Sequence, residues 1–151
     1  MTTVTLNQLL RRQVAAHGDK IALKFEGDSR SYTDIDRHAA QIAHGMIACG
    51  VKPGDRVAYL GKNTLAYFEY FLGAAKARAV TVPVNWRLAE PEVGYILENA
   101  RPKLLLVEPQ FEAAAVNVAP HVERLVTGGP HDTFLGWRDR QHEDPVDPLV
   151  D

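Results

Sequence analysis

The chain has 151 residues, of which 46% are hydrophobic and 24% charged, and its formal net charge is −2. This composition is typical of a globular protein and excludes a largely disordered one. The near-neutral charge argues against binding to nucleic acid. The single cysteine, Cys49, excludes an intrachain disulfide and a multi-cysteine metal site.

Localisation signals are lacking in the sequence. No apolar run approaches the roughly 20 residues of a membrane helix. The N-terminus has no basic segment followed by an apolar one, which a secretory signal requires. We therefore expect a cytoplasmic protein without an integral membrane segment.

The first 31 residues predict a helix followed by a β-hairpin. Thr5 and Gln8 have the spacing of a capping box, and Gly18 can end the helix in a left-handed conformation. The segment Ile21–Phe25 has strand character, and a turn at Gly27 would return the chain antiparallel.

A second helix is expected next, capped by Thr33 and ended by Gly50. Its apolar residues recur at intervals of four, three and four, which predicts one buried stripe. The stripe consists of Ile35, Ala39, Ile42 and Met46.

From Arg56 onward, strands and helices alternate with short connections. This order predicts a largely parallel sheet flanked by helices, and the apolar strands indicate that both sheet faces are buried. The expected strands are Arg56–Leu60, Val80–Val84, Leu104–Val107 and Leu125–Thr127. The expected helices begin at Asn63 or Thr64, Glu90 and Phe111, and end near Arg78, Asn99 and Val118.

The charge distribution divides the chain in two. Residues 1–130 carry 15 basic and 13 acidic side chains, whereas residues 131–151 carry 2 basic and 6 acidic ones. The last stretch also contains Pro145 and Pro148 and shows little apolar periodicity. We predict an α/β subdomain over 1–130, followed by an acidic, irregular and solvated connector over 131–151.

Catalytic and metal-binding motifs are absent. The string Gly61-Lys62-Asn63-Thr64 lacks the first glycine and the hydroxyl residue of a phosphate-binding loop, so a helix cap is the better interpretation. The six histidines lack metal-site spacing and are expected to be solvated or capping. Cys49 is expected to be a small buried residue near a helix end. The sequence therefore predicts no catalytic residue and no metal ligand.

Four strings, in order, resemble the acyl-adenylate-forming (AMP-binding) superfamily. They are Ser31–Ile35, Gly50–Ala58, Asn63-Thr64 and Ala74–Asn85, and the resemblance covers about residues 5–110. The Asn-Trp-Arg-Leu string after the last motif is most similar to fatty or aromatic acyl-CoA synthetases. One departure is Arg78, which stands where the family carries a glycine, so it must stay helical or adopt a left-handed conformation.

The resemblance implies part of the large N-terminal domain of an enzyme that uses ATP, Mg²⁺ and CoA. Such an enzyme converts a carboxylic acid to acyl-AMP and then to a thioester. The family's phosphate loop and C-terminal domain are missing from this sequence, so the chain is expected to be an inactive N-terminal fragment without cofactors of its own. Residues 131–151 would lead toward the missing phosphate loop, and an open sheet edge or apolar face could cause self-association.

The resemblance also implies candidate site residues. In the family, the loop after the Ala74–Asn85 motif lies near the CoA side of the cleft, which makes Asn85, Trp86 and Arg87 candidates for lining it. Alternatively, Trp86 packs and Arg87 forms a structural ion pair.

Three other functions stay open. The chain could be a stand-alone binding or assembly module without catalysis. It could belong to an amino-acid-activating or luciferase-like member of the superfamily. A nucleotide-dependent oxidoreductase would need a glycine fingerprint that the sequence lacks.

Overall fold

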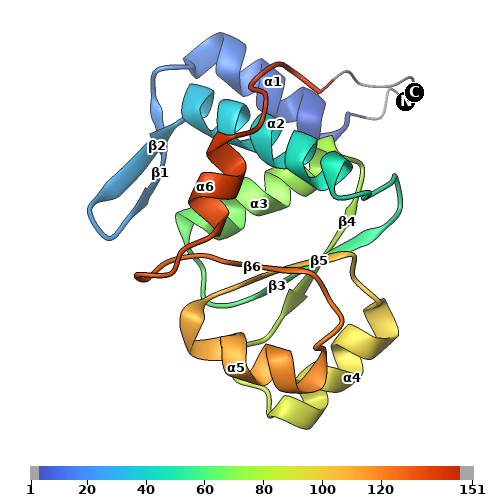
Figure 1. Ribbon diagram of the computed structural model, residues 1–151. Helices are drawn as coiled ribbons and strands as arrows, with labels where there is room; N and C mark the ends of the chain where they lie inside the picture. Colours follow the sequence, from blue (N-terminus) through green and yellow to red (C-terminus); the bar gives the residue numbers. More distant parts are fainter. Residues whose placement is uncertain (1–3, 147–151) are drawn as a thin grey trace.

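The computed structural model describes residues 4–146, which form helical layers on both faces of a parallel sheet (Figure 1). The strands are β1 (Ile21–Phe25), β2 (Asp28–Ser31), β3 (Arg56–Leu60), β4 (Val80–Val84), β5 (Leu104–Val107) and β6 (Arg124–Val126). The helices are α1 (Leu6–His17), α2 (Tyr32–Ala48), α3 (Leu65–Lys76), α4 (Glu90–Ala100), α5 (Pro109–Val118) and α6 (Phe134–Asp139). The fold class predicted from the sequence is confirmed.

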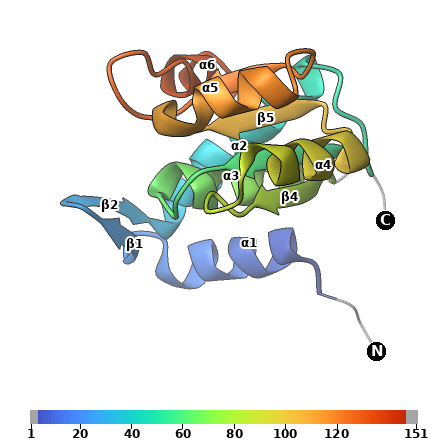
Figure 2. The same ribbon diagram turned by 90° about the horizontal axis from the view of Figure 1, so that it is seen from below.

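The four-stranded sheet has the order β4-β3-β5-β6, and all its strands are parallel. Within it, Ala58 is paired with Val82 on one side and Leu105 on the other. Strands β1 and β2 form a separate antiparallel hairpin, which projects beyond the layers in Figure 2. No helix in the described part of the chain is long and apolar enough to cross a membrane.

Side chains of the sheet alternate between two apolar clusters. Tyr59, Leu104 and Leu106 lie in the cluster under α2, α3 and α6, whereas Leu105 and Val107 lie in the cluster over α4 and α5. All five are at most 2% exposed. Because both faces are covered, the strands contain continuous apolar runs rather than alternating ones.

The capping box of Thr5 and Gln8 is confirmed, but the expected cap of the second helix is wrong. The N-cap of α2 is Ser31, whose hydroxyl accepts a hydrogen bond from the Asp34 amide at 3.0 Å while the Asp34 carboxylate accepts one from the Ser31 amide. This reciprocal pair satisfies two backbone donors at once, which Thr33 cannot do from inside the helix.

Gly18 ends α1, but not in the expected conformation. Its φ is −44°, within the right-handed region. A Cβ atom at this position would lie 2.8 Å from the Thr33 hydroxyl oxygen. Gly18 therefore provides space for the start of α2 rather than a left-handed turn.

Arg78 adopts the left-handed conformation, with φ at +58°. Its amide and the next one bond back to the carbonyls of Ala75 and Ala74, which closes the end of α3. A glycine would adopt this conformation without the Cβ clash. The family departure at Arg78 thus changes the residue but keeps the turn.

The stretch 131–151 is not irregular throughout, since residues 134–139 form α6. Phe134 is fully buried and Trp137 packs beside it, with ring centroids 6.1 Å apart. The apolar residues Phe134 and Trp137 are three positions apart and share one helix face, and this short periodicity among charged residues is the signal that the composition masked. Residues 147–151 of the predicted connector lie outside the described residues.

Candidate functional site: the carboxyl edge of the sheet and a buried charged cluster

The loops that follow β3 and β4 enclose a depression of about 250 Å³ at the carboxyl edge of the sheet. Ligands of open parallel sheets bind outside this edge, because the strand-to-helix loops meet there. The depression is lined by Tyr59, Gly61, Asn63, Tyr67, Pro83, Val84, Asn85 and Trp86.

The structure brings the three predicted residues together in one turn after β4. The Asn85 side-chain oxygen accepts a hydrogen bond from the Arg87 amide at 3.0 Å. The Trp86 ring packs against Phe111, with centroids 5.9 Å apart, and the Arg87 guanidinium lies 4.2 Å above the Trp86 ring centroid. Trp86 therefore packs, as one expectation had it, while Arg87 stacks on the ring.

Lys62 is the residue of this edge that sequence reasoning missed as a site residue. Its ammonium group lies 5.0 Å from the Trp86 centroid, so two cations share one indole. Each such contact contributes about 0.5–1 kcal/mol at an exposed site. The Lys62 and Arg87 side chains thus place positive charge over the Trp86 ring, whereas the Glu108 carboxylate places negative charge beside the Lys62 backbone.

Polar contacts fix the conformation of the loop after β3. The Tyr59 hydroxyl donates to the Lys62 carbonyl, and the Lys62 amide donates to the Glu108 carboxylate. Burial raises the pKa of Tyr59 to about 12, which keeps this hydroxyl a donor. Since the Lys62 amide is occupied by a carboxylate, the loop is unsuited to hold a phosphate there, in agreement with the rejected phosphate-loop motif.

A second polar feature lies inside the helical layer. Glu69 of α3 is 1% exposed, and its carboxylate meets three donors from other elements. Oε1 accepts from Arg30 Nε at 2.9 Å and contacts His38 Nδ1 at 2.8 Å, and Oε2 accepts from Arg138 Nη1 at 3.0 Å. We call Arg30, His38, Glu69 and Arg138 the Glu69 cluster.

The Glu69 carboxylate is ionised because its neighbours outweigh its burial. Burial alone would raise its pKa, but the hydrogen bond and charge of His38 and the guanidiniums of Arg138 and Arg30 lower the pKa of Glu69 below its ordinary value. The expectation of a solvated or capping His38 is wrong, since this residue is only 6% exposed. A buried carboxylate needs partners, and α2 supplies one of them through His38.

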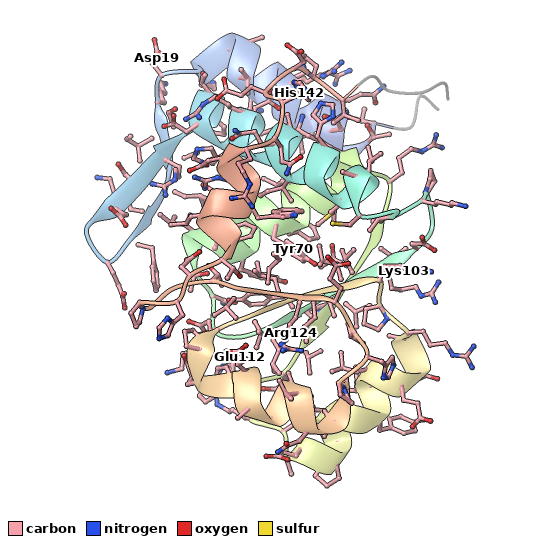
Figure 3. The ribbon with its side chains drawn as sticks, viewed as in Figure 1. Asp19, Tyr70, Lys103, Glu112, Arg124 and His142 are labelled. Atoms are coloured by element: carbon pink, nitrogen blue, oxygen red, sulfur yellow. The ribbon has the colours of Figure 1, made fainter. Side chains whose placement is uncertain are left out.

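The remaining candidates form no further site. Cys49 is half-buried at the end of α2 rather than buried, and burial and Glu123 raise the pKa of its thiol. His44 Nε2 lies 3.0 Å from the Asp144 carbonyl oxygen. The ring centroids of His44 and His142 are 6.0 Å apart, and His142 is labelled in Figure 3. Within residues 4–146, no three metal-ligating side chains are placed to share an ion.

A family model described as AMP-binding enzyme matches residues 10–147. A fatty acid–[acyl-carrier-protein] ligase, ScoC, from Streptomyces coeruleorubidus is 39% identical over 123 residues, which is 78% of this chain and 22% of that protein. A feruloyl-CoA synthase from an Amycolatopsis species is 38% identical over 108 residues, 71% of this chain and 22% of that protein.

Solved structures share the fold. The N-terminal domain of FACL13 from Mycobacterium tuberculosis superposes with a TM-score of 0.87 at 25% identity, covering 99% of this chain and 39% of that one. The chain thus spans about a fifth of the length of the curated relatives that it matches.

Proposed function

Because this chain belongs to the AMP-binding enzyme family, we propose that the intact protein is an acid–thiol ligase of the acyl-CoA synthetase type. A substrate carboxylate oxygen attacks the α-phosphorus of Mg-ATP, pyrophosphate leaves, and acyl-AMP forms. The thiol sulfur of CoA then attacks the acyl carbonyl, AMP leaves with the bonding electron pair, and the thiol proton is released. The observation that carries this proposal is the family match over residues 10–147.

Binding of ATP is assigned to parts of the ligase beyond this chain. The loop after β3 has its Lys62 amide engaged by Glu108, whose negative charge opposes a phosphate. We therefore propose that the 151 residues alone form neither acyl-AMP nor thioester. Residues 131–151 would then serve as the connector toward the phosphate-binding part.

The turn Asn85–Arg87 is proposed to line the CoA side of the cleft. Its support is the paired positive charge of Arg87 and Lys62 over Trp86, because CoA carries phosphate groups that such charges attract. Asn85 holds the Arg87 amide and so fixes the turn.

Two further properties complete the proposal. We propose that the protein is cytoplasmic and that the isolated chain self-associates through an open sheet edge or an apolar face; β4 is an edge strand, and its Val80 is 50% exposed.

The acceptor thiol has a second candidate. The 39% identical relative is named as a ligase that uses an acyl carrier protein, so a carrier-bound thiol is the alternative to free CoA. An amino-acid-activating enzyme is a further alternative, since surfactin synthase subunit 2 of Bacillus subtilis is 34% identical over 105 residues. A stand-alone module without catalysis is the alternative of a different class.

Pyrophosphate release and thioester formation by the intact protein test these proposals. The assay would offer fatty, aromatic and amino acids with ATP, and then either CoA or a carrier protein as acceptor. We expect pyrophosphate release with a fatty or aromatic acid and thioester formation with CoA. The 151-residue chain, assayed in parallel, should be inactive. Absence of any pyrophosphate release from the intact protein would contradict the ligase function.

Kinetics of an Arg87→Ala variant test the CoA-side turn. We expect a higher KM for CoA with an unchanged KM for ATP, because one of two cations at the edge is lost. Arg101→Ala is the matched control, since Arg101 is an exposed arginine at the end of α4. Equal KM values for CoA in both variants would contradict the assignment.

A further inference from the structure

We propose that Glu69 is a positioning residue whose carboxylate anchors α6 through Arg138 and so holds residues 140–146 along α2. Its consequence for ligase turnover rests on the proposed function, whereas the anchor itself does not. The two claims are therefore tested by separate measurements.

The two oxygens of Glu69 have separate tasks. Oε1 is shared by Arg30 from β2 and His38 from α2. Oε2 accepts from Arg138 Nη1 at 3.0 Å, which ties α6 to the buried carboxylate, and the same Nη1 lies 3.5 Å from His38 Nδ1. The bond to α6 can therefore be removed without removing the partners of Oε1.

Helix α6 depends on such contacts because it cannot persist by itself. It has six residues, and its N-cap residue Thr133 makes no capping bond, so the Leu135 amide donates to the Asp132 carboxylate at 2.8 Å instead. Isolated helices of this length are not stable in water. Its docking on the layer below is made by Phe134, by Trp137 and by the buried guanidinium of Arg138, which is 6% exposed.

The segment after α6 packs Val146 against the apolar cluster, and its other contacts with α2 are weak polar ones. The Gln41 side-chain amide donates to the Gln141 backbone carbonyl at 3.4 Å, and the His44 ring contacts the Asp144 backbone carbonyl. Arg37 and Glu143 pair at 3.4 Å with both side chains exposed, a kind of pair that contributes about 0–1 kcal/mol. The Arg138–Glu69 bond is buried and charge-assisted, so it is stronger than these polar contacts of the segment.

Removal of Arg138 and removal of Glu69 have different consequences for the charge balance of the core. If Arg138 is removed, Glu69 keeps Arg30 and His38, and the core stays compensated. If Glu69 is removed, the buried Arg138 guanidinium loses its buried carboxylate and keeps Asp139, which is 57% exposed, and a 3.5 Å contact with His38 Nδ1. An uncompensated buried charge is strongly destabilising. Arg138 is therefore the residue with which to test the anchor.

A second contact seats α6 from the side of α2. Gly45 of α2 lies under the Trp137 ring, and a Cβ atom there would be 2.4 Å from the ring atom Cζ2. A Gly45→Ala substitution would lift Trp137 while raising the helical propensity of α2. It disturbs the seat of α6 without touching any charge.

Hydrogen–deuterium exchange of the intact protein tests the anchor without requiring activity. In Arg138→Met we expect amides of residues 137–146 to exchange faster by about tenfold or more, the loss of a hydrogen bond to a charged group. Amides of β3 and β5 should keep their wild-type protection. Gly45→Ala should show the same pattern, and Arg140→Met, an exposed arginine beside it, should show none.

Two results would overturn the proposal. In the first, residues 137–146 of Arg138→Met exchange as in the wild type. In the second, protection falls equally in β3, β5 and α6, which would make the bond a contribution to global stability. If Arg138→Met fails to fold, Arg138→Gln, which removes the charge but keeps a polar side chain, must show the same local loss of protection.

A double variant confirms the partner. Glu69→Gln leaves Arg138 without its buried carboxylate, so the added Arg138→Met should recover part of the lost thermal stability. Additive losses in the double variant would contradict a direct bond. In the intact ligase, Arg138→Met should raise the KM for ATP more than it lowers kcat. Unchanged kinetics beside a local loss of protection would overturn only the consequence for turnover.

Discussion

The two faces of the parallel sheet are built on different principles. The face under α4 and α5 is closed by apolar side chains, and its neighbouring ion pair, Glu112–Arg124, stays at the rim with both partners partly exposed (Figure 3). The face under α2, α3 and α6 contains a comparable apolar cluster, but the layer above it also buries charged side chains. Those charged side chains are Glu69, Lys76 and Arg138, and the polar His38 is buried beside them.

Apolar side chains are enough to cover a sheet face, whereas buried charged contacts fix the position of a particular segment. Apolar packing is non-directional and tolerates small shifts between helices. A buried carboxylate with three donors requires each donor at a defined distance and direction. The charged layer joins β2, α2, α3 and α6, of which α6 lies far later in the sequence than the other three.

The largest expected effect is the loss of the buried carboxylate. Replacing Glu69 with leucine should lower the free energy of unfolding by about 3–5 kcal/mol, since buried guanidiniums lose their partner. Glu112→Leu on the other face should cost less than about 1 kcal/mol, because that carboxylate is 39% exposed. Urea unfolding of the two variants makes the comparison, and losses within 1 kcal/mol of each other would remove the distinction between the faces.

The sequence predicts the apolar packing of the fold better than its buried charged contacts. The bounds of the first three parallel-sheet strands agree with the predictions, and the stripe from Ile35 to Met46 is buried throughout. These features depend on local periodicity, which is present in the sequence. The parallel order follows from alternation alone.

The Glu69 cluster could not be predicted in this way. Its members are separated by 8, 31 and 69 positions, and none forms a motif with a neighbour. Only the crossing of α2 and α3 and the return of α6 bring them together. The Asn85–Arg87 turn was found through the family resemblance, while Lys62 joins it from another loop and carried no local signal.

A second test uses two helical glycines on opposite faces. A Cβ at Gly73 of α3 would lie 2.4 Å from Cγ2 of the fully buried Ile42, whereas one at Gly94 of α4 would lie 3.1 Å from Cβ of Val118. Overpacking costs about 1–3 kcal/mol and the gain in helix propensity is about 1 kcal/mol. We expect Gly73→Ala to lose about 2 kcal/mol and Gly94→Ala to change little in thermal unfolding. Equal losses would show that both helix layers are packed with the same tolerance.

Acidification should weaken the charged layer selectively. The pKa of Glu69 is lowered in the folded protein, so its contribution to stability is present above the ordinary pKa of a glutamate, about 4.3, and is lost as the pH falls through the folded value. Glu69→Gln lacks this contribution, so its stability should fall less steeply than that of the wild type below about pH 5. The pKa of Asp34 is also lowered, by its hydrogen bonds with Ser31. Because Asp34 is present in both the wild type and the variant, its contribution to the pH dependence is the same in the two profiles. Parallel pH profiles in urea unfolding would contradict the role of Glu69.

The smallest expected effect is one in which the two faces agree. Helix α3 ends beside Arg78 and α4 ends at Arg101, and both arginines adopt the left-handed conformation with φ at +58° and +48°. That conformation costs a residue with a Cβ about 1–2 kcal/mol, while glycine gives back about 0.5–1 kcal/mol through its freer unfolded chain. Arg101→Gly should therefore gain about 0.5–1 kcal/mol, or roughly 1–4 °C in Tm, and Arg78→Gly should gain less, because its side chain has an interaction that is lost with it.

The matched alanine variants decide whether the backbone is the cause. Arg78→Ala and Arg101→Ala remove the same side chains but retain the Cβ, so they should not gain stability. If alanine and glycine raised the Tm equally, the arginine side chains rather than their φ angles would be unfavourable. If only Arg101→Gly gained, the Arg78 side chain would contribute enough near α3 to offset its backbone strain. The turn that joins α3 to the sheet would then also be stabilised by a specific polar contact, like the helical layer on this face of the sheet.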